Sequence, residues 1–506
     1  MWSGILKKAL ETVLITFLSL LVPGIAAAAC HAVSVNGSGN LSGSDWNNTM
    51  ANLPATMVRG DTYYLADGRG YNLQGLAVAS GTIVTTVKKA MAADQGQGCT
   101  PSIGAWWNAA TMGSGQAVFV GEQDLFGFAY FVIDGQRRTA LNSGHGIKLD
   151  GSGCKDVLPG DNTANCHGWT LGANGSAKAN NVTIRYTETT GSQAATLGLN
   201  NSDRPVFAYA NDVGAGQLHD ITLEYNYFHH SACDFILTRN VTNFTAQFNY
   251  FYLNNGGTEC HGQAWEENLS TSLIARYNVF NDIQGTATLV VLNDDASART
   301  TTGWDIYGNV FYDYIGGSGW NSNGTVACIN TGITCVNIHV YNNTFANQQN
   351  NAGAGSNSVG ATIQQSTCTN CDFKNNIFYN VNANVAFQID FTEDYNSIIF
   401  SGARSGILRG THDIVDAANT NLFTNFNVAP PASSNFLLTG QANSDYTGGV
   451  SLAPPYNQSC SVLTCSSLTL IARGGGGIWE RGAYQFISGS ASGPNPPQNL
   501  VLTSVQ

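Results

Sequence analysis

The sequence predicts an all-β protein, a right-handed parallel β-helix that forms a single domain. Three observations favour this fold: a motif that recurs about every 30 residues, strand-like alternation before each copy, and no sustained helical periodicity between copies. A repeat of this length, made of short strands and loops, is typical of a solenoid whose coils stack on one another.

The recurring motif is Asn-x-Phe at the end of a run that alternates apolar and polar residues. The copies are ITLEYNYF ending at Phe228, FTAQFNYF at Phe251, LIARYNVF at Phe280, WDIYGNVF at Phe311, IHVYNNTF at Phe345 and CDFKNNIF at Phe378. Successive Phe positions are 23, 29, 31, 34 and 33 residues apart. An antiparallel sandwich would show frequent two-residue hairpin turns and would not reuse one turn residue.

Each residue of the motif has a physical role in a stack of coils. We expect the Asn to adopt left-handed backbone at a turn and to hydrogen-bond to the same Asn one coil away. We expect the Phe to fill the interior at the same height in every coil. The prediction is a single file of Asn226, Asn249, Asn278, Asn309, Asn343 and Asn376.

The N-terminus predicts an export signal over residues 1–29. Lys7 and Lys8 precede an apolar stretch from Val13 to Val22, and small residues follow at 26–29. The apolar stretch is shorter than the roughly 20 residues of a membrane span. We therefore expect a secreted protein, extracellular or periplasmic. A lipid anchor at Cys30 is the alternative, although Ala27 stands where such signals usually have Leu.

The 12 cysteines agree with export, because disulfides persist in oxidising compartments. Close spacing predicts four pairs: Cys154 with Cys166, Cys328 with Cys335, Cys368 with Cys371, and Cys460 with Cys465. A bond between Cys30 and Cys99 would exclude the lipid anchor. Cys368-Thr-Asn-Cys371 also has the spacing of a metal-binding pair, but the sequence places no second such pair nearby.

Composition excludes one class of partner. The formal net charge is −12, with 21 Lys and Arg against 33 Asp and Glu. Nucleic-acid binding requires a basic surface, so it is not expected. The same charge disfavours long-range attraction of polyanions, although a local site with Arg or Ca²⁺ remains compatible with one.

Both ends of the repeat region look like caps, and the predicted β-helix domain covers residues 30–487. The segment from Gly81 to Lys89 is the first full strand, and Glu480-Arg-Gly-Ala-Tyr484 closes the domain. Residues 488–506 form a Gly, Ser and Pro-rich tail. Its Leu500-Val-Leu502 segment is either a disordered end or a strand that pairs with the exposed sheet edge of another chain.

Together, the start of the chain, the Asn-x-Phe coils, Asp394-Tyr-Asn396 and Arg481-Gly-Ala-Tyr484 resemble bacterial pectate-lyase-like β-helix proteins. The resemblance covers nearly the whole predicted mature chain. It implies the fold and an action on polysaccharide. It does not imply one activity, because that superfamily contains lyases, hydrolases and binding proteins.

The densest group of reactive residues lies between Phe228 and Asp295. Cys233 and Cys260 are 27 residues apart, about one coil, and adjacent strands are close enough for a disulfide. Counting forward from a stacked cysteine pair places Asp234 beside His261 and Arg239 beside Glu266. The same count places Asn240 beside Glu267. The Asp234–His261 pair is the one least affected by register slips, and it is either catalytic or a structural hydrogen bond.

The first functional hypothesis is β-elimination of a uronic-acid polymer. This reaction needs a base and a positive charge that neutralises the uronate carboxylate. Arg239 or His261 would be the base, and Arg276 or Ca²⁺ bound by Asp294 and Asp295 would assist. Alginate and chondroitin lyases of this fold are distantly similar: a basic residue on one coil is followed on the next by Arg-His-Gly. Arg239 and His261-Gly262 match that layout, whereas Cys260 replaces its Arg.

The second hypothesis is glycoside hydrolysis of a neutral glycan, and the third is a non-catalytic adhesin, glycan-binding protein or filament subunit. Hydrolysis needs two carboxyl groups, for which Asp234, Glu266 and Glu267 are candidates. Substrate contacts are assigned to His230, Gln263, Trp265, Glu267 and Arg276. The alternatives are that His230 is a solvated loop residue, Trp265 packs in the core, and Asp294-Asp295 is a solvated turn that binds no Ca²⁺.

Overall fold

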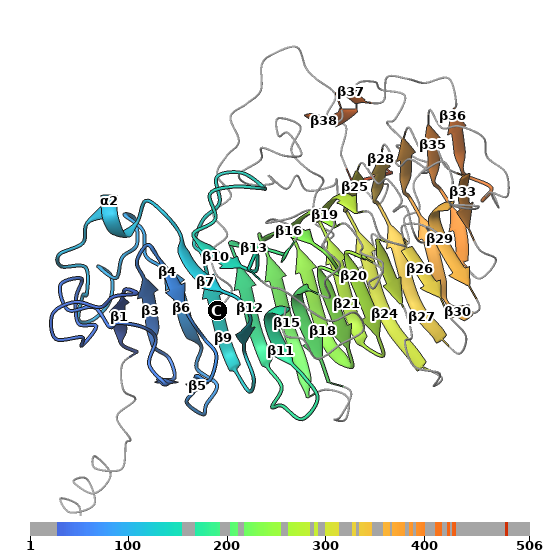
Figure 1. The fold of residues 1–506 in the computed structure, drawn as a ribbon. Coiled ribbons are helices and arrows are strands. Elements are labelled where there is room, and N and C mark those ends of the chain that lie inside the picture. Colours follow the sequence, from blue (N-terminus) through green and yellow to red (C-terminus); the bar gives the residue numbers. More distant parts are fainter. Residues whose placement is uncertain are drawn as a thin grey trace, which may run out of the picture.

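The computed structural model forms a right-handed parallel β-helix with three long sheets as its faces (Figure 1). It describes residues 28–153, 167–192, 203–210, 217–254, 262–283, 288–291, 299–312, 326–329, 333–346, 358–364, 367–379, 384–387, 391–399, 410–416, 423–425, 428–431 and 481–483. Along the chain, a coil takes one strand from each of the three sheets in turn. The predicted fold class is therefore confirmed.

The first sheet has 13 strands. Its order is β1 (Cys30–Val33), β3 (Thr62–Leu65), β6 (Thr85–Lys89), β9 (Ala129–Asp134), β12 (Asn180–Arg185), β15 (Leu218–Glu224), β18 (Val241–Gln247), β21 (Thr271–Arg276), β24 (Arg299–Tyr307), β27 (Ile333–Tyr341), β31 (Cys371–Lys374) and β34 (Phe391–Asp394), with β30 (Thr367–Thr369) paired to β27.

The second sheet has 12 strands. They are β4 (Gly68–Tyr71), β7 (Ala117–Val120), β10 (Ile147–Asp150), β13 (Thr187–Thr190), β16 (Tyr227–Ser231), β19 (Tyr250–Asn254), β22 (Val279–Ile283), β25 (Val310–Tyr312), β28 (Thr344–Ala346), β32 (Ile377–Tyr379), β35 (Ser397–Ile399) and β36 (Ile414–Asp416).

The third sheet has nine strands and carries the region where the sequence predicts a site. They are β8 (Gln123–Asp124), β11 (His167–Gly172), β14 (Arg204–Tyr209), β17 (Ile236–Arg239), β20 (Trp265–Asn268), β23 (Leu289–Val291), β26 (Val326–Ile329), β29 (Ser358–Gln364) and β33 (Asn384–Phe387).

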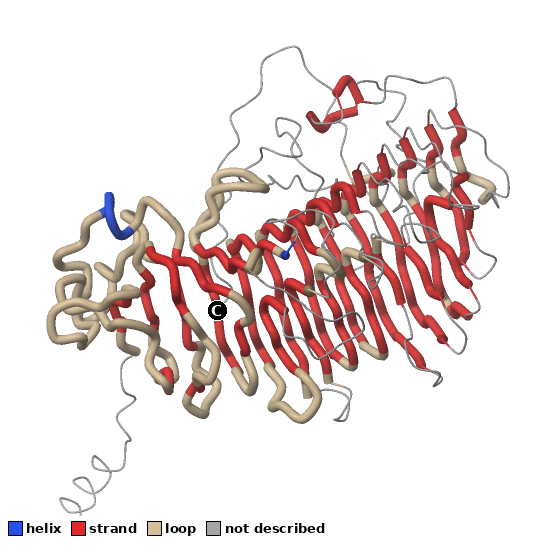
Figure 2. The backbone as a smooth tube through the Cα atoms, viewed as in Figure 1, coloured by secondary structure: helices blue, strands red, loops and turns tan. Residues whose placement is uncertain are grey.

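Outside the three sheets, the described part of the chain consists of loops, one short helix and two small sheets (Figure 2). One four-residue helix, α2 (Ala109–Met112), follows an Asn108 cap. The strands β2 (Thr56–Met57) and β5 (Ala77–Val78) pair in parallel, and β37 (Phe423–Asn425) pairs with β38 (Val428–Pro431) in antiparallel. None of the helices found among the described residues has the length and apolar character needed to cross a membrane.

The motif phenylalanines form one stacked file in the interior, as predicted. The six rings of Phe228, Phe251, Phe280, Phe311, Phe345 and Phe378 lie with successive centroids 5.2, 4.8, 4.9, 4.7 and 4.7 Å apart. These spacings match the distance between neighbouring strands of a sheet, so each coil contributes one ring to the same level of the core.

The motif asparagines form a buried hydrogen-bonded ladder between the first and second sheets. From Asn226 to Asn376, each side-chain oxygen accepts a hydrogen bond from the backbone N–H of the Asn one coil earlier. These N···Oδ1 distances are 2.9 to 3.0 Å. The side-chain amides donate to backbone carbonyls, such as Asn278 Nδ2 to the oxygen of Ala246 at 2.9 Å. The predicted single file is confirmed, and it continues to Asn396.

One part of the turn prediction is wrong: the Asn is not the left-handed residue. The residue before it has positive φ, 58° at Tyr225, 57° at Phe248 and 55° at Tyr277. The left-handed residue makes the corner, and the Asn behind it is thereby directed into the coil stack. Gly308 occupies the same place with φ 65°, where a side chain would meet the ring of Tyr277.

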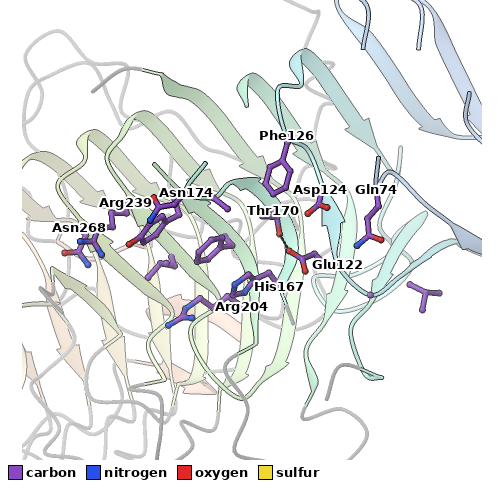
Figure 3. Close-up of a pocket in the computed structure, with 16 residues that line it drawn as sticks. Gln74, Glu122, Asp124, Phe126, His167, Thr170, Asn174, Arg204, Arg239 and Asn268 are labelled. Carbon is purple, nitrogen blue, oxygen red and sulfur yellow. Dashed lines mark hydrogen bonds between the residues drawn. The ribbon is translucent and has the colours of Figure 1, made fainter. Parts of the chain in front are cut away.

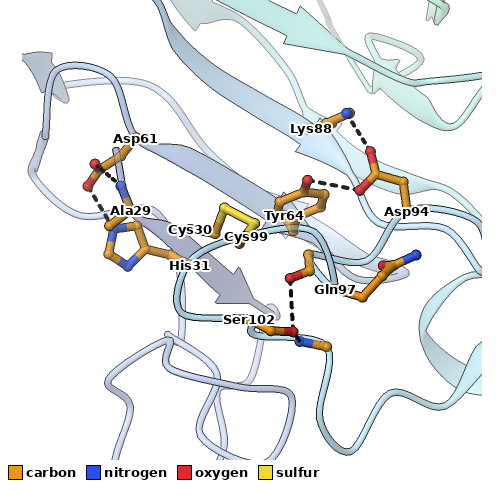
Figure 4. Close-up of a disulfide and its surroundings, with 12 residues drawn as sticks. Ala29, Cys30, His31, Asp61, Tyr64, Lys88, Asp94, Gln97, Cys99 and Ser102 are labelled. Atoms are coloured by element: carbon orange, nitrogen blue, oxygen red, sulfur yellow. Dashed lines mark hydrogen bonds and ion pairs between the residues drawn. A yellow bond between two sulfur atoms is a disulfide. The ribbon is translucent and has the colours of Figure 1, made fainter. Parts of the chain in front are cut away.

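The N-terminal end is held by a disulfide between Cys30 in β1 and Cys99, with a Cα separation of 6.0 Å (Figure 4). Nearby, Asp94 accepts hydrogen bonds from Tyr64 Oη at 2.9 Å and Lys88 Nζ at 2.5 Å. The predicted Cys30–Cys99 bond is confirmed. Because the thiol of Cys30 is used in it, this structure leaves no thiol there for a lipid.

The predicted closing segment packs beside the last coils of the described structure. The guanidinium of Arg481 donates to the carbonyl oxygens of Asn396 at 2.6 Å and His412 at 2.7 Å. The Ala483 amide donates to Thr344 Oγ1 at 2.9 Å. Leu500-Val-Leu502 and the rest of the 488–506 tail lie outside the described residues.

The ladder predicts a large, position-specific loss of stability. Asn278→Ala leaves the Asn249 amide and the Ala246 carbonyl buried without these partners, which we expect to cost about 2–5 kcal/mol. Asn72→Ala, which removes one exposed hydrogen bond, is the control and should cost under about 1 kcal/mol. Chemical denaturation of both variants measures this. Equal losses would show that the ladder adds nothing beyond an ordinary hydrogen bond.

Candidate functional site

The coil register around the predicted site is 29 residues. In the β17–β20 pair, Leu237 lies beside Glu266, Thr238 beside Glu267, and Arg239 beside Asn268. The 27-residue register expected from Cys233 and Cys260 is therefore wrong here, and Arg239 is not paired with Glu266. Loops of different length between strands change the count from coil to coil, so a cysteine pair does not fix the strands that follow it.

The corrected register separates residues that the sequence grouped together. Since successive residues of a strand point to opposite faces, Trp265 and Glu267 face the interior, while Glu266 and Asn268 are on the outer face. Trp265 is fully buried in the core and its Nε1 donates to Thr238 Oγ1 at 2.7 Å. Trp265 is thus a packing residue, and its predicted stacking on a sugar ring is wrong.

Glu267 is also fully buried, so its predicted contact with substrate is wrong. Its carboxyl accepts hydrogen bonds from the Thr238 hydroxyl, from the Ser270 amide at 2.5 Å and from Thr301 Oγ1 at 3.2 Å. Burial raises the pKa of Glu267 to about 7, and these hydrogen bonds only partly oppose that rise. The group belongs to a polar network inside the helix.

Asp234 lies in a buried ion pair and not beside a histidine in the described structure. Its Oδ2 accepts a hydrogen bond from Arg204 Nε at 3.1 Å, and its Oδ1 accepts the Gln263 amide at 3.0 Å. Asp234 and Gln263 are both fully buried. The residue whose amide meets Asp234 from the next coil is therefore Gln263, while His261, its expected partner, lies outside the described residues. Asp234 positions the guanidinium of Arg204.

A cavity of about 810 Å³ lies over the outer face of the nine-stranded sheet (Figure 3). Polar, charged and aromatic side chains from β8, β11, β14, β17 and β20 contribute to its wall. The lining residues are Gln74, Val120, Gly121, Glu122, Asp124, Phe126, His167, Thr170, Ala173, Asn174, Arg204, Phe207, Tyr209, Leu237, Arg239 and Asn268. Of the predicted catalytic residues that the structure describes, Arg239 lines this cavity, whereas the buried Asp234 and Glu266 do not.

Aromatic rings organise the middle of this cavity. The rings of His167 and Phe207 stack with centroids 4.0 Å apart, and those of Phe207 and Tyr209 stack at 5.4 Å. The guanidinium of Arg239 lies over the ring of Tyr209, 5.0 Å from its centroid. The stack fixes the orientation of the His167 imidazole and, through a cation–π contact, of Arg239.

Two arginines and one neutral imidazole therefore share a wall. Burial, together with the positive charge of Arg204, lowers the pKa of His167 to about 3. His167 is consequently uncharged at neutral pH, so the positive charge of the cavity comes from Arg204 and Arg239. An anionic group of a ligand would find guanidinium partners here.

The opposite end of the cavity carries two carboxyl groups. Thr170 Oγ1 donates to Glu122 Oε1 at 2.9 Å, and Glu122 and Asp124 share a hydrogen bond. Burial, with a smaller contribution from the neighbouring Asp124, raises the pKa of Glu122 to about 6 against the opposing hydrogen bond from Thr170. Burial also raises the pKa of Asp124. A carboxyl group with such a pKa can exchange a proton near neutral pH.

Two other predicted substrate contacts lie on different sheets. His230 is on β16 of the 12-stranded sheet, with its Nδ1 2.6 Å from His229 Nδ1, and it is half-buried and not a solvated loop residue. Arg276 ends β21 of the 13-stranded sheet, where its Nε donates to Gln247 Oε1 at 2.7 Å. The structure does not bring either residue to the cavity.

Several predicted residues lie outside the described part of the chain. They are His261, Asp294, Asp295 and the cysteines Cys154, Cys166, Cys260, Cys460 and Cys465. Cys233 is in a disulfide, and its expected partner Cys260 is one of these residues. The predicted Cys328–Cys335 and Cys368–Cys371 bonds are both formed.

Sequence reasoning missed most of the cavity wall. Glu122, Asp124, His167, Arg204 and Tyr209 lie in early coils, before the first clear Asn-x-Phe copy at Phe228. Without a repeat to set the register, nothing in the sequence indicated that these residues share a face. The alternation of Phe207 and Tyr209 was the one local signal.

No protein-family model matches the chain, and a comparison with curated protein sequences finds no match. Among solved structures, a GH136 lacto-N-biosidase from Eubacterium ramulus aligns over 77% of this chain and 68% of its own, with 10% identity and a TM-score of 0.29. A PL6 family alginate lyase aligns over 80% and 56%, with 12% identity and a TM-score of 0.34.

A third solved structure is the A-module of a mannuronan C-5 epimerase from Azotobacter vinelandii. It aligns over 77% of this chain and 88% of its own, with 12% identity and a TM-score of 0.26. These proteins are parallel β-helix enzymes, and the likeness is one of fold alone. The strand pairing of this chain establishes the fold independently of them.

The interior carboxyl of Glu267 predicts a pH-dependent stability. Its pKa of about 7 in the folded protein exceeds the unfolded value, so its protonated form favours folding at low pH. That contribution, about 3 kcal/mol in order of magnitude, is lost as the pH rises from about 4.5 to about 7.

We expect Glu267→Gln to be more stable relative to the natural protein at pH 8 than at pH 5, because Gln cannot ionise. Urea denaturation of both proteins at the two pH values gives the two differences in unfolding free energy. An identical difference at both pH values would place the Glu267 pKa outside this range.

Proposed function

We propose that this is a secreted carbohydrate-active enzyme that cleaves a uronic-acid polymer by β-elimination in the cavity on the nine-stranded sheet. The observation that carries the proposal is the set of side chains that line one cavity. It combines the guanidinium groups of Arg204 and Arg239 with a Glu122 carboxyl whose pKa is about 6. These are the two kinds of group that this reaction requires.

The chemistry assigns a role to each group. β-Elimination begins with removal of the proton beside the uronate carboxylate, and a cation that neutralises that carboxylate stabilises the developing charge. Arg239 supplies this charge in our proposal, and Arg204, held by Asp234, supplies a second guanidinium. Glu122 in its ionised form accepts the proton, and the Tyr209 hydroxyl protonates the leaving oxygen.

The dimensions of the sheet are compatible with an extended substrate. Neighbouring strands are about 4.8 Å apart, so β8 with Glu122 next to it and β17 with Arg239 are separated by about 14 Å across β11 and β14. An oligosaccharide laid across these strands would contact both ends of the cavity. Within it, Glu122 would remove the proton of one uronate unit while the Arg239 side chain, which extends over the Tyr209 ring of β14, held the carboxylate of that same unit.

Glycoside hydrolysis is supported less well. The two carboxyl groups of a hydrolase stand about 5 Å or more apart on either side of the scissile bond. Glu122 and Asp124 share a hydrogen bond, which is too close for that arrangement. The carboxyls first considered for hydrolysis, on Asp234, Glu266 and Glu267, are buried and do not line the cavity.

Export remains part of the proposal. The disulfides between Cys30 and Cys99, Cys328 and Cys335, and Cys368 and Cys371 are consistent with an oxidising compartment. The test of function is a panel of acidic and neutral polysaccharides. Ultraviolet absorbance of unsaturated uronate products would support a lyase. New reducing ends without that absorbance would show that the protein is a hydrolase and not a lyase. The absence of turnover on every polymer would favour a binding or filament protein.

Replacing the proposed neutralising residue should abolish most of the activity. We expect Arg239→Ala to lower kcat/KM by about 100-fold or more, since it removes a charge that acts on the transition state. Arg239→Lys should recover part of this loss, because it keeps the charge but not the planar guanidinium.

Arg276→Ala is the matched control, because Arg276 is an arginine on a different face of the helix. We expect it to keep the activity of the natural enzyme on the same polymer. Comparable losses in Arg239→Ala and Arg276→Ala, with folding verified by circular dichroism, would contradict the location of the site.

The Glu122 carboxyl predicts the pH profile. If ionised Glu122 is the base, kcat/KM should fall about tenfold per pH unit below about pH 6 and level off above it. Glu122→Gln should lower the plateau by about 10²–10⁴-fold and remove this acidic limb. A variant with low activity but the same limb would show that another group titrates.

A further inference from the structure

Four cysteines from two consecutive coils meet at the turn between the nine-stranded and the 13-stranded sheets. Cys328 is in β26 and Cys335 in β27, and these two form one disulfide. Cys368 is in β30 and Cys371 begins β31, and these form another. All four are buried, with exposed fractions of 1%, 0%, 8% and 2%.

The two disulfides lie against each other. Cys335 and Cys368 are direct partners in the parallel pairing of β27 and β30. The sulfur atoms of Cys328, Cys335 and Cys368 all lie within 4.8 Å of one another, and Cys371 is bonded to Cys368. In the described part of the chain, this is the one group of three or more His, Cys, Asp or Glu residues whose ligand atoms converge so closely. The sequence showed no second cysteine pair near Cys368-Thr-Asn-Cys371, but in the fold Cys328 and Cys335 lie beside it.

We propose that these four cysteines, when reduced, form a tetrahedral thiolate site for Zn²⁺ or a similarly soft divalent metal. Zinc–sulfur bonds of about 2.3 Å place the sulfurs of a tetrahedron about 3.8 Å apart. The sulfurs of Cys328, Cys335 and Cys368 already lie within 4.8 Å of one another, which brings the two coils into range. A disulfide holds its two sulfurs about 2 Å apart, so after reduction the sulfurs of each pair must move apart by about 2 Å to reach this spacing. The Cα separations of 6.8 Å for Cys328–Cys335 and 5.8 Å for Cys368–Cys371 allow the bonded sulfurs to separate by side-chain rotation.

The surroundings favour a structural metal over a catalytic one. Four thiolates fill the coordination shell and leave no position for water, which is typical of structural zinc sites. The neighbouring core residues Ile333, Ile338 and Phe373 are apolar and buried. No substrate reaches such a position, so the site is separate from the cavity of the proposed lyase and does not depend on that function.

The metal and the disulfides would hold the helix differently. Each disulfide closes a short loop within one coil, with sequence separations of 7 and 3. A metal bound by all four sulfurs would join one coil to the next, since Cys335 and Cys368 belong to different coils. The same residues thus provide an intracoil link when oxidised and an intercoil link when reduced and metal-bound.

The conversion balances with a thiol or phosphine reductant. Each disulfide takes up two electrons and two protons to give two thiols, and the reductant is oxidised by two electrons. Binding of Zn²⁺ to the four thiols then releases up to four protons as the thiolates form. The reverse path requires an oxidant and loss of the metal, as an oxidising compartment provides.

The experiment refolds the full chain from denaturant in a phosphine reductant with Cd²⁺ as the probe, so burial does not block access. We expect one equivalent of Cd²⁺ bound at these four residues, with the ultraviolet charge-transfer band of cadmium thiolate and a higher thermal midpoint than the reduced, metal-free protein. Co²⁺ in place of Cd²⁺ should give the visible bands of a tetrahedral thiolate complex.

Controls separate this site from the other cysteines. The quadruple variant with Cys328→Ser, Cys335→Ser, Cys368→Ser and Cys371→Ser keeps the remaining eight thiols and should lose one equivalent of metal and the tetrahedral Co²⁺ bands. The control variant with Cys30→Ser and Cys99→Ser removes a distant pair and should retain this equivalent of metal and the tetrahedral Co²⁺ bands. The proposal is overturned if the quadruple variant binds the same amount of metal, or if the natural chain gives no tetrahedral Co²⁺ spectrum.

A second variant covers the case in which the quadruple variant does not fold. Cys335→Ser alone removes one ligand at the centre of the group and should replace the tetrahedral Co²⁺ spectrum with that of a three-thiolate site. An unchanged spectrum in Cys335→Ser, with the natural chain as reference, also overturns the proposal.

Discussion

The fold depends on the hydrogen bonds that each coil makes to the next at the corner between the first and second sheets. A coil by itself cannot bury its apolar face, so it is stable only when the next coil stacks on it in a fixed register. The Asn ladder sets that register: the side-chain oxygen of each Asn accepts the backbone N–H of the Asn one coil earlier, from Asn226 onward. These groups are fully buried, which makes a slipped register costly.

The other regular features follow from this corner. With the asparagines aligned, the phenylalanine two residues later has the same height in every coil, which produces the stack from Phe228 to Phe378. The constraint weakens with distance along the coil. Between the second sheet and the nine-stranded sheet, each coil has a connection of variable length. The offset therefore changes from 23 residues between Asn226 and Asn249 to 29 residues between β17 and β20.

Because the register is less constrained farther from the Asn ladder, the fold was predictable from the sequence and most of the site was not. The ladder and the phenylalanine file lie close to the motif, so their alignment could be read directly from the spacing. The outer face of the nine-stranded sheet lies half a coil away, and a count from Cys233 and Cys260 placed Arg239 beside Glu266 where the structure places Asn268. A shift of two residues keeps a side chain on its face, so Glu266 lies on the same outer face as Arg239 although the two are not partners.

The alternation of side chains between the two faces of a strand decided which of the predicted site residues face the core. Trp265 and Glu267 alternate with Glu266 along β20, and only their strand positions show that they face the core. The buried Glu267 with its hydroxyl partners is a polar group within the interior, and its raised pKa has the same cause as that of Glu122: removal from water. Of the two, Glu122 is exposed to a cavity, and that difference separates a structural carboxyl from a candidate for catalysis.

The sequence by itself determined the solenoid, its repeat, the ladder and most of the disulfide pairs that the described residues contain, because each depends on residues close together in the chain or repeated at a visible period. The tertiary structure alone decided that Glu122, His167 and Arg204 share a wall with Arg239, and that two cysteine pairs meet in neighbouring coils. Those arrangements join residues up to 117 positions apart, as for Glu122 and Arg239, across loops of unequal length. Which of these side chains meet depends on the lengths of all the loops between them. No short sequence pattern shows that total, so the contacts are determined only when the coils stack.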